Sequence, residues 1–283
     1  MSQRIPSITR EQVATYLKPR PRDSHKGLFG TVLVIGGASG MVGAALLAGR
    51  AALKLGAGCV HVGLLADHAP VVDMVQPELM LHSAESALRM LKPDVLAIGC
   101  GLGTSISAQK LLHDALKRNT ALVLDADALN LLARHPNLRD DLHARKAATV
   151  ITPHPGEAAR LLGISTPEVQ AARTQSAQQL AEKLHCPLVL KGADSVCVTR
   201  SGSMYLNKTG NPGMSAPGMG DVLTGMIAAF VAQGLDADQA LLLAVHLHGV
   251  AGDALAEQGV TVGMTATELT EWARWLVNQW GLK

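Results

Sequence analysis

Residues 31–65 read TVLVIGGASGMVGAALLAGRAALKLGAGCVHVGLL, and they join two apolar, β-branched-rich runs through a glycine-rich turn and a segment with helical spacing. The runs Thr31–Ile35 and Cys59–Leu65 predict strands, and Gly43–Leu55 predicts the helix between them. Two strands connected through a crossover helix are typically parallel neighbours in one sheet. This stretch therefore predicts an α/β fold with a parallel sheet.

The same alternation continues along the chain, and it predicts three layers, α/β/α, with a mostly parallel central sheet covered by helices on both faces. No linker, charge block or repeat divides the sequence, so we expect one domain over residues 1–283, although the length also allows two. Further strands are predicted at Asp94–Ile98, Ala121–Leu124, Thr149–Ile151 and Pro187–Leu190. Further helices are predicted at Ser105–Asn119, Ala128–Arg134, Pro167–His185, Met219–Gln233, Ala237–Glu257 and Thr267–Trp280.

The last predicted helix carries Trp272, Trp275 and Leu276 at spacings of three and four residues. Such spacing is typical of a stripe that faces the core of the protein. A subunit interface is the alternative interpretation of this stripe.

Composition excludes several classes of function. The formal net charge is only +2, and lysines and arginines are spread along the chain, so no electrostatic footprint for nucleic acid is present. Aromatic residues make up 2% of the chain, which leaves few platforms on which bases could stack. We therefore expect no nucleic-acid partner, and any bound nucleotide must be held by backbone, aliphatic and polar groups.

The cysteines and the first residues point to a cellular location. Cys59, Cys100, Cys186 and Cys197 lie in or beside apolar runs without a C-x-x-C pair, which predicts buried free thiols in a reducing compartment. Residues 1–17 carry no apolar signal core, and no window reaches the roughly 18 uninterrupted apolar residues that a membrane span needs. We expect a soluble, cytoplasmic protein with no membrane partner.

The glycine-rich turn at residues 211–225, NPGMSAPGMGDVLTG, leads directly into an apolar helical pattern. The first N–H groups of a helix have no intrahelical partner, and the helix dipole places positive charge there, so a phosphate can bind. Gly218, Met219 and Gly220 are the predicted anion hole. Asp221 would face the same anion, a poor place for a carboxylate unless it meets a metal, a substrate hydroxyl or a moving proton. The pairing indicates phosphoryl transfer to a hydroxyl.

Polar or glycine-rich residues follow several predicted strands, at Gly36–Gly43, Gly99–Gly103, Asp125–Asn130 and Thr152–Glu157. In a doubly wound sheet these loops line one shared crevice. The first of them matches neither the G-x-G-x-x-G fingerprint nor a Walker A loop, and a tight strand-to-helix turn explains it equally well. A single Asp or His at a strand end is more often a helix cap, but several at successive strand ends favour a site.

Two further motifs have competing interpretations. Residues 191–195, KGADS, form either a polar hairpin turn, which spacing alone favours, or a nucleotide site with Lys191 near phosphate. His246 and His248 lie two residues apart in a predicted helix and point to different faces, so we expect no shared metal.

Taken in order from about residue 24 to 255, the motifs SHKG, GAALLAGRAALKLGAG, DADALN, TPHPGE, KGADS and NPGM…GMGDVLTG resemble the NAD(P)H-hydrate dehydratase family. The resemblance implies a ribokinase-like fold. It also implies the repair of NADHX and NADPHX, the hydrated and inactive forms of reduced nicotinamide cofactors. ADP is the expected co-substrate, with ATP as the alternative donor, and Mg²⁺ is implied by the reaction class rather than by a metal cage in the sequence.

The resemblance carries roles onto individual residues. It implies Asp221 as the catalytic base that deprotonates the ring hydroxyl. By motif match, the hydrated dinucleotide contacts Ala44, Gly101, His154 and Asp221, and the nucleotide contacts Lys191, Gly192, Ala193, Asp194, Ser195 and Gly220. Three positions depart from the family pattern, namely Pro217, Cys100 and Lys208. Pro217 has no N–H to donate, so the anion hole must use residue 218 onward.

The resemblance further implies a homotetramer and a separate NAD(P)HX epimerase that acts upstream on another polypeptide. Two other functions remain open at this point. A small-alcohol kinase of the same fold, acting on a vitamin precursor, would share the glycine-rich turn and Asp221. A nucleotide sensor without catalysis would keep the crevice, but the presence of Asp221 at the anion site argues against it.

Overall fold

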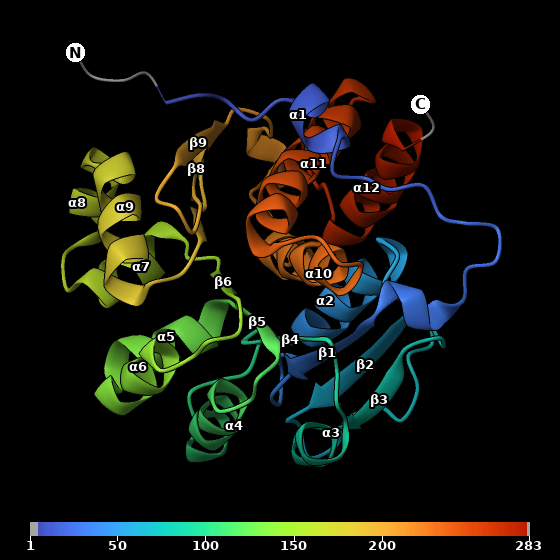
Figure 1. Ribbon diagram of the computed structural model, residues 1–283, viewed down its shortest axis with the longest axis vertical. Helices are drawn as coiled ribbons and strands as arrows, with labels where there is room; N and C mark the ends of the chain where they lie inside the picture. Colours follow the sequence, from blue (N-terminus) through green and yellow to red (C-terminus); the bar gives the residue numbers. More distant parts are fainter. Residues whose placement is uncertain (1–4, 282–283) are drawn as a thin grey trace.

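The computed structural model describes residues 5–281, which form a nine-stranded sheet between two layers of helices (Figure 1). The strand order is β3-β2-β1-β4-β5-β6-β7-β8-β9. Strands β1 to β7 pair in parallel, whereas β8 and β9 add an antiparallel edge. The strands are β1 Thr31–Gly36, β2 Cys59–Leu64, β3 Met80–Ser83, β4 Val95–Ile98, β5 Ala121–Leu124, β6 Thr149–Ile151, β7 Leu188–Leu190, β8 Ser195–Val198 and β9 Met204–Asn207.

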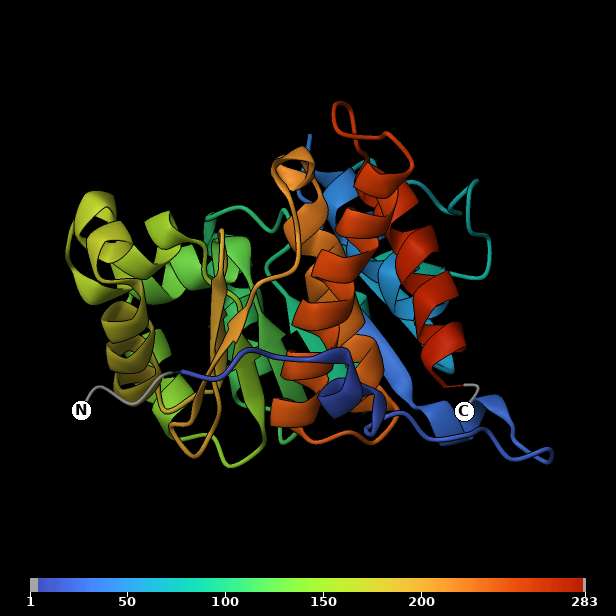
Figure 2. The same cartoon turned by 90° about the horizontal axis from the view of Figure 1, so that it is seen from above.

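The longest helices cover one face of the sheet, and Figures 1 and 2 show two of them, α11 and α12, side by side. This face carries α1 Arg10–Ala14, α2 Val42–Lys54, α10 Met219–Ala232, α11 Ala237–Glu257 and α12 Ala266–Trp280. The opposite face carries α3 Ala84–Met90, α4 Ile106–Leu116, α5 Ala126–Arg134, α6 Pro136–His143, α7 Pro155–Leu162, α8 Thr166–Ala171 and α9 Arg173–Leu184. Two 3₁₀ turns, η1 Lys26–Phe29 and η2 Pro212–Met214, complete the elements.

Apolar side chains on the two faces of the sheet belong to two separate cores. On β1, Val32 and Val34 pack toward α2 and α10, whereas Leu33 and Ile35 pack toward α3 and α4, in keeping with the two-residue period of a strand. Residues 32–36 are all buried, as expected of a strand with helices on both faces. The predicted parallel α/β fold is therefore confirmed.

Several elements differ from the sequence predictions. The segment 167–185 is not one helix, because the chain leaves the helical conformation at Ala172, with φ −135° and ψ 50°, between α8 and α9. The short elements α1, α3, α6, α7, β3 and β9 were not predicted. The predicted core-facing stripe on α12 is partly wrong, because Trp275 is 53% exposed and Leu269, Ala273 and Trp280 form the buried side instead.

The cysteines fit the prediction with one exception. All four are free, and three are buried, whereas Cys59 is half-buried on β2. Among the described residues, α11 is the only helix long and apolar enough to span a bilayer, yet 67% of its apolar window is buried inside the protein. A core helix of a soluble fold passes the same test of length and composition.

Candidate active site

The start of α10 has the geometry of an anion site. Gly218 is the N-cap residue with φ +88°, a left-handed conformation that glycine adopts without a steric penalty. A Cβ at this position would lie 2.5 Å from Leu47 Cδ1 and 3.0 Å from Ala266 Cβ. The first bond in the helix runs from Val222 N to Gly218 O, 3.0 Å. The N–H groups of residues 219–221 therefore precede the helical hydrogen bonds and are available to an anion.

A buried carboxylate joins three elements beside this helix start. Asp125, at the end of β5, accepts a hydrogen bond from Lys191 Nζ at 2.7 Å and one from Thr224 Oγ1 at 2.8 Å. Its Oδ1 also accepts from the next backbone N–H, that of Ala126, at 2.8 Å. Lys191 follows β7 and Thr224 lies in the first turns of α10, so this cluster ties the two strand ends to the helix that holds the anion hole.

Lys191 lies directly next to the anion hole. A Cβ built at Gly220 would lie 3.2 Å from Lys191 Nζ and 3.6 Å from Asp125 Oδ2. A side chain at position 220 would therefore crowd the space between the helix start and the ammonium group. Burial lowers the pKa of Lys191, but the charges of Asp125 and Glu157 outweigh that effect and leave it raised.

Asp221 is half-buried in the first turn of α10. Burial and the nearby charge of Asp125 raise the pKa of Asp221 to about 6, while the Cys100 thiol and Lys191 act in the opposite direction. The same neighbourhood raises the pKa of Cys100, chiefly through burial, so its thiol stays protonated and can donate to the carboxylate. A carboxylate with a pKa near neutrality suits the transfer of a proton at physiological pH.

Ala44 and Gly101, which are predicted to contact the same ligand, lie together. Gly101 has φ +59°, and a Cβ on it would lie 3.1 Å from Ala44 Cβ and 2.7 Å from Met41 O. Two backbone bonds hold the loops after β1 and β4 against each other, from Gly37 N to Cys100 O at 3.0 Å and from Ala38 N to Gly101 O at 2.7 Å. The glycines of both loops thus serve close backbone packing.

A polar chain links the loops after β4, β5 and β6. Asp127 accepts from Gly103 N at 2.8 Å and from Asn130 Nδ2 at 3.2 Å, and Arg160 of α7 donates to Asn130 Oδ1 at 2.9 Å. Asp127 and Asn130 therefore fix the loop after β4 relative to α5. Asp127 and Asn130 of the DADALN motif thus have structural roles, in addition to the role of Asp125 in the same motif.

His154 is the N-cap residue of α7, where Pro155 at the first helical position and Glu157 at the third form a helix-start signature. Its Nδ1 accepts from Gly156 N at 3.0 Å, and Glu157 Oε2 accepts from His154 N at 2.8 Å. The imidazole itself is half-exposed, and burial together with Lys191 lowers its pKa. Burial raises the pKa of Glu157 to about 7.

Residues 191–195 form the connection of an antiparallel hairpin between β7 and β8, as spacing alone predicted. Ser195 Oγ donates to Gly192 O at 2.9 Å, and Asp194 has φ +51°. Arg173, at the start of α9, donates to Leu190 O at 3.2 Å and to Lys191 O at 3.3 Å. The hairpin is thus braced from the α8–α9 break, and Gly192 to Asp194 are exposed, where a nucleotide can reach them.

The two histidines of α11 have different hydrogen-bond partners. His248 Nε2 donates to Met219 O at 2.9 Å, and burial lowers the pKa of His248 to about 4, so it is a neutral brace under the helix start. His246 Nδ1 lies 3.2 Å from Asn207 Oδ1. Within residues 5–281, no group of three or more His, Cys, Asp or Glu side chains is arranged to hold a metal ion.

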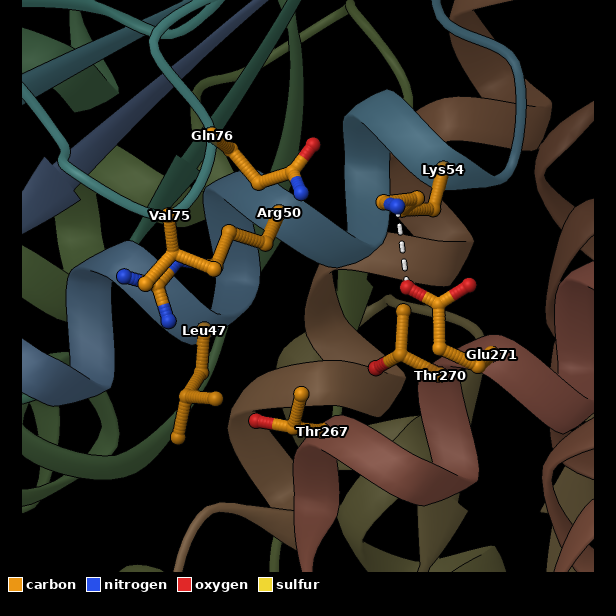
Figure 3. A pocket seen from close by; sticks show the side chains of 8 residues that line it. All are labelled: Leu47, Arg50, Lys54, Val75, Gln76, Thr267, Thr270 and Glu271. Carbon is orange, nitrogen blue, oxygen red and sulfur yellow. Dashed lines mark ion pairs between the residues drawn. The ribbon is translucent and has the colours of Figure 1, made fainter.

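A hollow lined in part by Leu47 lies between α2, α12 and the loop before β3 (Figure 3). Its cations are already paired. Lys54 Nζ is 2.9 Å from Glu271 Oε1, and the Arg50 guanidinium makes two 2.7 Å bonds to the buried Asp73. Asp73 Oδ1 in turn accepts from Val75 N at 2.9 Å, so the ion pair holds this loop in place rather than offering free charges to a ligand.

The sequence motifs contain most of these residues, but three contributors were given no individual role from the sequence. The structure brings Ala44, Gly101, Lys191, Gly220 and Asp221 to the carboxyl edge of the sheet. It adds Thr224, Arg173 and Glu157. A signal existed only for Glu157, which stands three residues after His154 as in a capping box.

Comparison with known proteins gives three agreeing results. A family model described as NAD(P)H-hydrate dehydratase matches residues 32–274. A bifunctional NAD(P)H-hydrate repair enzyme of Coxiella burnetii is 46% identical and aligns over 93% of this chain and 53% of its own length. An ADP-dependent (S)-NAD(P)H-hydrate dehydratase of Neisseria meningitidis is 40% identical over 93% of this chain and 90% of its own.

A solved structure agrees with them. The ADP/ATP-dependent NAD(P)H-hydrate dehydratase of Bacillus subtilis, co-crystallised with ATP and Mg²⁺, superposes with a TM-score of 0.88 at 32% identity, covering 99% of this chain and 100% of that one. The chain spans about half the length of the bifunctional relatives that it matches. It spans nearly all of the relatives that are named as dehydratases alone.

Proposed function

The chain belongs to the NAD(P)H-hydrate dehydratase family, and we propose that it converts the S-epimer of NADHX or NADPHX back to NADH or NADPH at the expense of ADP. Its fold is the ribokinase-like fold of solved relatives. The observation that carries the proposal is the juxtaposition of Asp221, the glycine-rich start of α10 and the Lys191 ammonium beside Gly220. Asp221 can act as a base, and the helix start and the ammonium form an anion site next to it.

The chemistry proceeds in two steps. Asp221 accepts the proton of the ring hydroxyl while the hydroxyl oxygen forms a bond to the terminal phosphorus of ADP, and AMP leaves with the electron pair of the broken bond. The ring C–O bond then breaks, phosphate leaves with that pair, and a proton leaves the adjacent ring carbon as the double bond re-forms. Phosphorylation thus converts a poor leaving group into a good one. Positioning and charge stabilisation dominate such a transfer.

The remaining site residues divide between the two ligands. We propose that the backbone from Gly218 to Gly220 binds the moving phosphoryl group. The hydrated dinucleotide contacts Ala44, Gly101 and His154, and the proximity of Ala44 Cβ to Gly101 supports a shared role for these two. The nucleotide binds along the hairpin, at Lys191, Gly192, Ala193, Asp194, Ser195 and, across from it, Gly220.

The site suits a Mg²⁺ ion held mainly by the nucleotide. Both carboxylate oxygens of Asp125 are already engaged, and the described residues offer no metal cage. Mg²⁺ commonly binds through substrate phosphates with one or two carboxylates. Both oxygens of Asp127 are engaged as well, by Gly103 N and Asn130 Nδ2, so the substrate phosphates would hold the ion, with Asp221 as the nearby carboxylate. When bound, the ion neutralises phosphate charge.

We further propose that residues 1–283 form a single dehydratase domain, that the protein is a cytoplasmic homotetramer, and that a separate epimerase supplies the S-epimer. The bifunctional relatives are about twice as long, which leaves room in them for a second activity.

The test is to mix the protein with hydrated NADH, Mg²⁺ and either ADP or ATP, and to follow reduced-nicotinamide absorbance and the nucleotide product. Recovery with ADP, together with release of AMP and phosphate, is expected. Recovery with ATP alone would overturn the choice of donor. A stable phosphorylated product without recovery would indicate a small-alcohol kinase instead.

A further inference from the structure

Building on the proposed function, we propose that the Lys191 ammonium is a fixed cation of the anion hole that binds the transferred phosphoryl group, and that Asp125 and Thr224 are positioning residues that hold it there. Lys191 would then act on the group that moves from ADP to the ring hydroxyl and leaves as phosphate. This role differs from that of an ordinary contact to the bound nucleotide.

The ammonium lies between Asp125 and the first turn of α10. Asp125 is 1% exposed and binds Lys191 Nζ at 2.7 Å, while Thr224 Oγ1 fixes the other carboxylate oxygen at 2.8 Å. The Lys191 side chain keeps 20% of its surface exposed. A Cβ at Gly220 would lie 3.2 Å from Nζ, so the ammonium lies beside the first turn of α10. An anion bound to the N–H groups of that turn lies against the ammonium as well.

A buried ion pair is poor evidence for a contribution to stability, because removing two charges from water offsets most of their attraction. We therefore assign the Asp125–Lys191 pair a role in catalysis rather than in stability. A charge fixed before the reaction needs no reorganisation when negative charge develops on the transferred phosphoryl oxygens. The same charge stabilises the phosphate when the ring C–O bond breaks, so one lysine serves both steps.

Several charged or titratable groups face Lys191 from the surrounding elements, and each of them contributes to any pH effect. They are Asp125 after β5, Glu157 and His154 at the start of α7, Cys100 after β4, Asp221 of α10 and His248 of α11. Of these, Asp125 has the strongest upward effect on the pKa of Lys191. Its charge therefore keeps the ammonium protonated at alkaline pH.

The direct test measures binding of inorganic phosphate to the AMP-saturated protein by calorimetry, which needs no turnover. We expect the wild type to bind phosphate and Lys191→Met to bind it at least about tenfold more weakly, with a clearly smaller loss of affinity for AMP. Lys110→Met, which changes an exposed lysine on α4, is the matched control. Loss of AMP affinity as large as the loss of phosphate affinity, or no phosphate binding by the wild type, would overturn the proposal.

Turnover of hydrated NADH gives the second readout. Lys191→Met should lower kcat roughly 10²- to 10³-fold, as does removal of one anion-hole donor in other enzymes. In the pH profile of kcat, Asp125→Asn should move the alkaline limb to lower pH than in the wild type. Thr224→Val should lower kcat more than Thr224→Ser, which keeps the hydroxyl. A folded Asp125→Asn variant with the wild-type kcat and pH profile would contradict the positioning role. An inactive wild type that still shows the binding pattern would refute the proposed reaction alone.

Discussion

The acid limb of the pH–rate profile should report the ionisation of Asp221. The proposed base must be deprotonated to accept the hydroxyl proton. Burial, together with the charge of Asp125, raises the pKa of Asp221 to about 6, and the deprotonated enzyme is therefore the active form above that pH. Activity should fall as pH decreases through 6 rather than through 4.

The size of the effect follows from that pKa. With a pKa of about 6, roughly 90% of Asp221 is deprotonated at pH 7 and roughly 10% at pH 5, so kcat/KM should drop about tenfold between them. A carboxyl group with its ordinary pKa would lose little over the same range. Asp221→Asn should remove the limb and lower the rate roughly 10²- to 10⁴-fold.

The assay is the initial rate of NADH recovery from its hydrate between pH 4.5 and 8.5 at saturating ADP, with folding checked by circular dichroism at each pH. Glu157 requires a control, because burial raises its pKa to about 7. Glu157→Gln should keep the limb near pH 6. Disappearance of the limb in Glu157→Gln, or its persistence in Asp221→Asn, would refute the role of Asp221.

Three further outcomes are expected from thermal or chemical unfolding. Asp221→Asn should stabilise the protein by up to about 3 kcal/mol at pH 7.5, because the raised pKa means that the charged carboxylate is disfavoured in the fold. This gain in the free energy of unfolding should grow as pH rises through 6 and vanish near pH 4. Gly218→Ala should cost more stability than Gly234→Ala and should also lower activity, since both glycines have positive φ but only Gly218 lacks space for a Cβ; equal losses would contradict this. Arg50→Met should destabilise by about 3 kcal/mol because it leaves buried Asp73 unpaired, and a change within 0.5 kcal/mol would show that the pair is dispensable.

The fold was largely predictable because strands buried on both faces leave a strong local signal. Ala121–Leu124 is a continuous apolar run, and Cys59–Leu64 is interrupted only by His61 and Gly63, as is typical of strands in a covered parallel sheet. The missed elements are those that tertiary contacts decide. The break at Ala172 precedes Arg173, whose guanidinium binds the carbonyls at the end of β7, a contact that no local pattern reveals.

The candidate site was predictable where a motif places a group by backbone geometry alone, as at Gly218 and Asp221. It was not predictable where a side chain acts through a distant partner. Thr224 lies 99 residues from Asp125 in sequence, and as a buried threonine within an apolar helix it gives no sign of that contact. The pairing of Lys191 with Asp125 likewise depends on the strand order, which brings the ends of β5 and β7 to one edge.

An oxygen label shows whether the ring hydroxyl is phosphorylated before it leaves. NADHX prepared in ¹⁸O-water carries the label in its ring hydroxyl, and after a single turnover with unlabelled ADP the released phosphate is analysed by mass spectrometry. If the hydroxyl is phosphorylated first, each phosphate should carry one ¹⁸O atom. Label found in water instead, with unlabelled phosphate, would contradict phosphorylation of the hydroxyl and with it the role given to Asp221 and the anion hole.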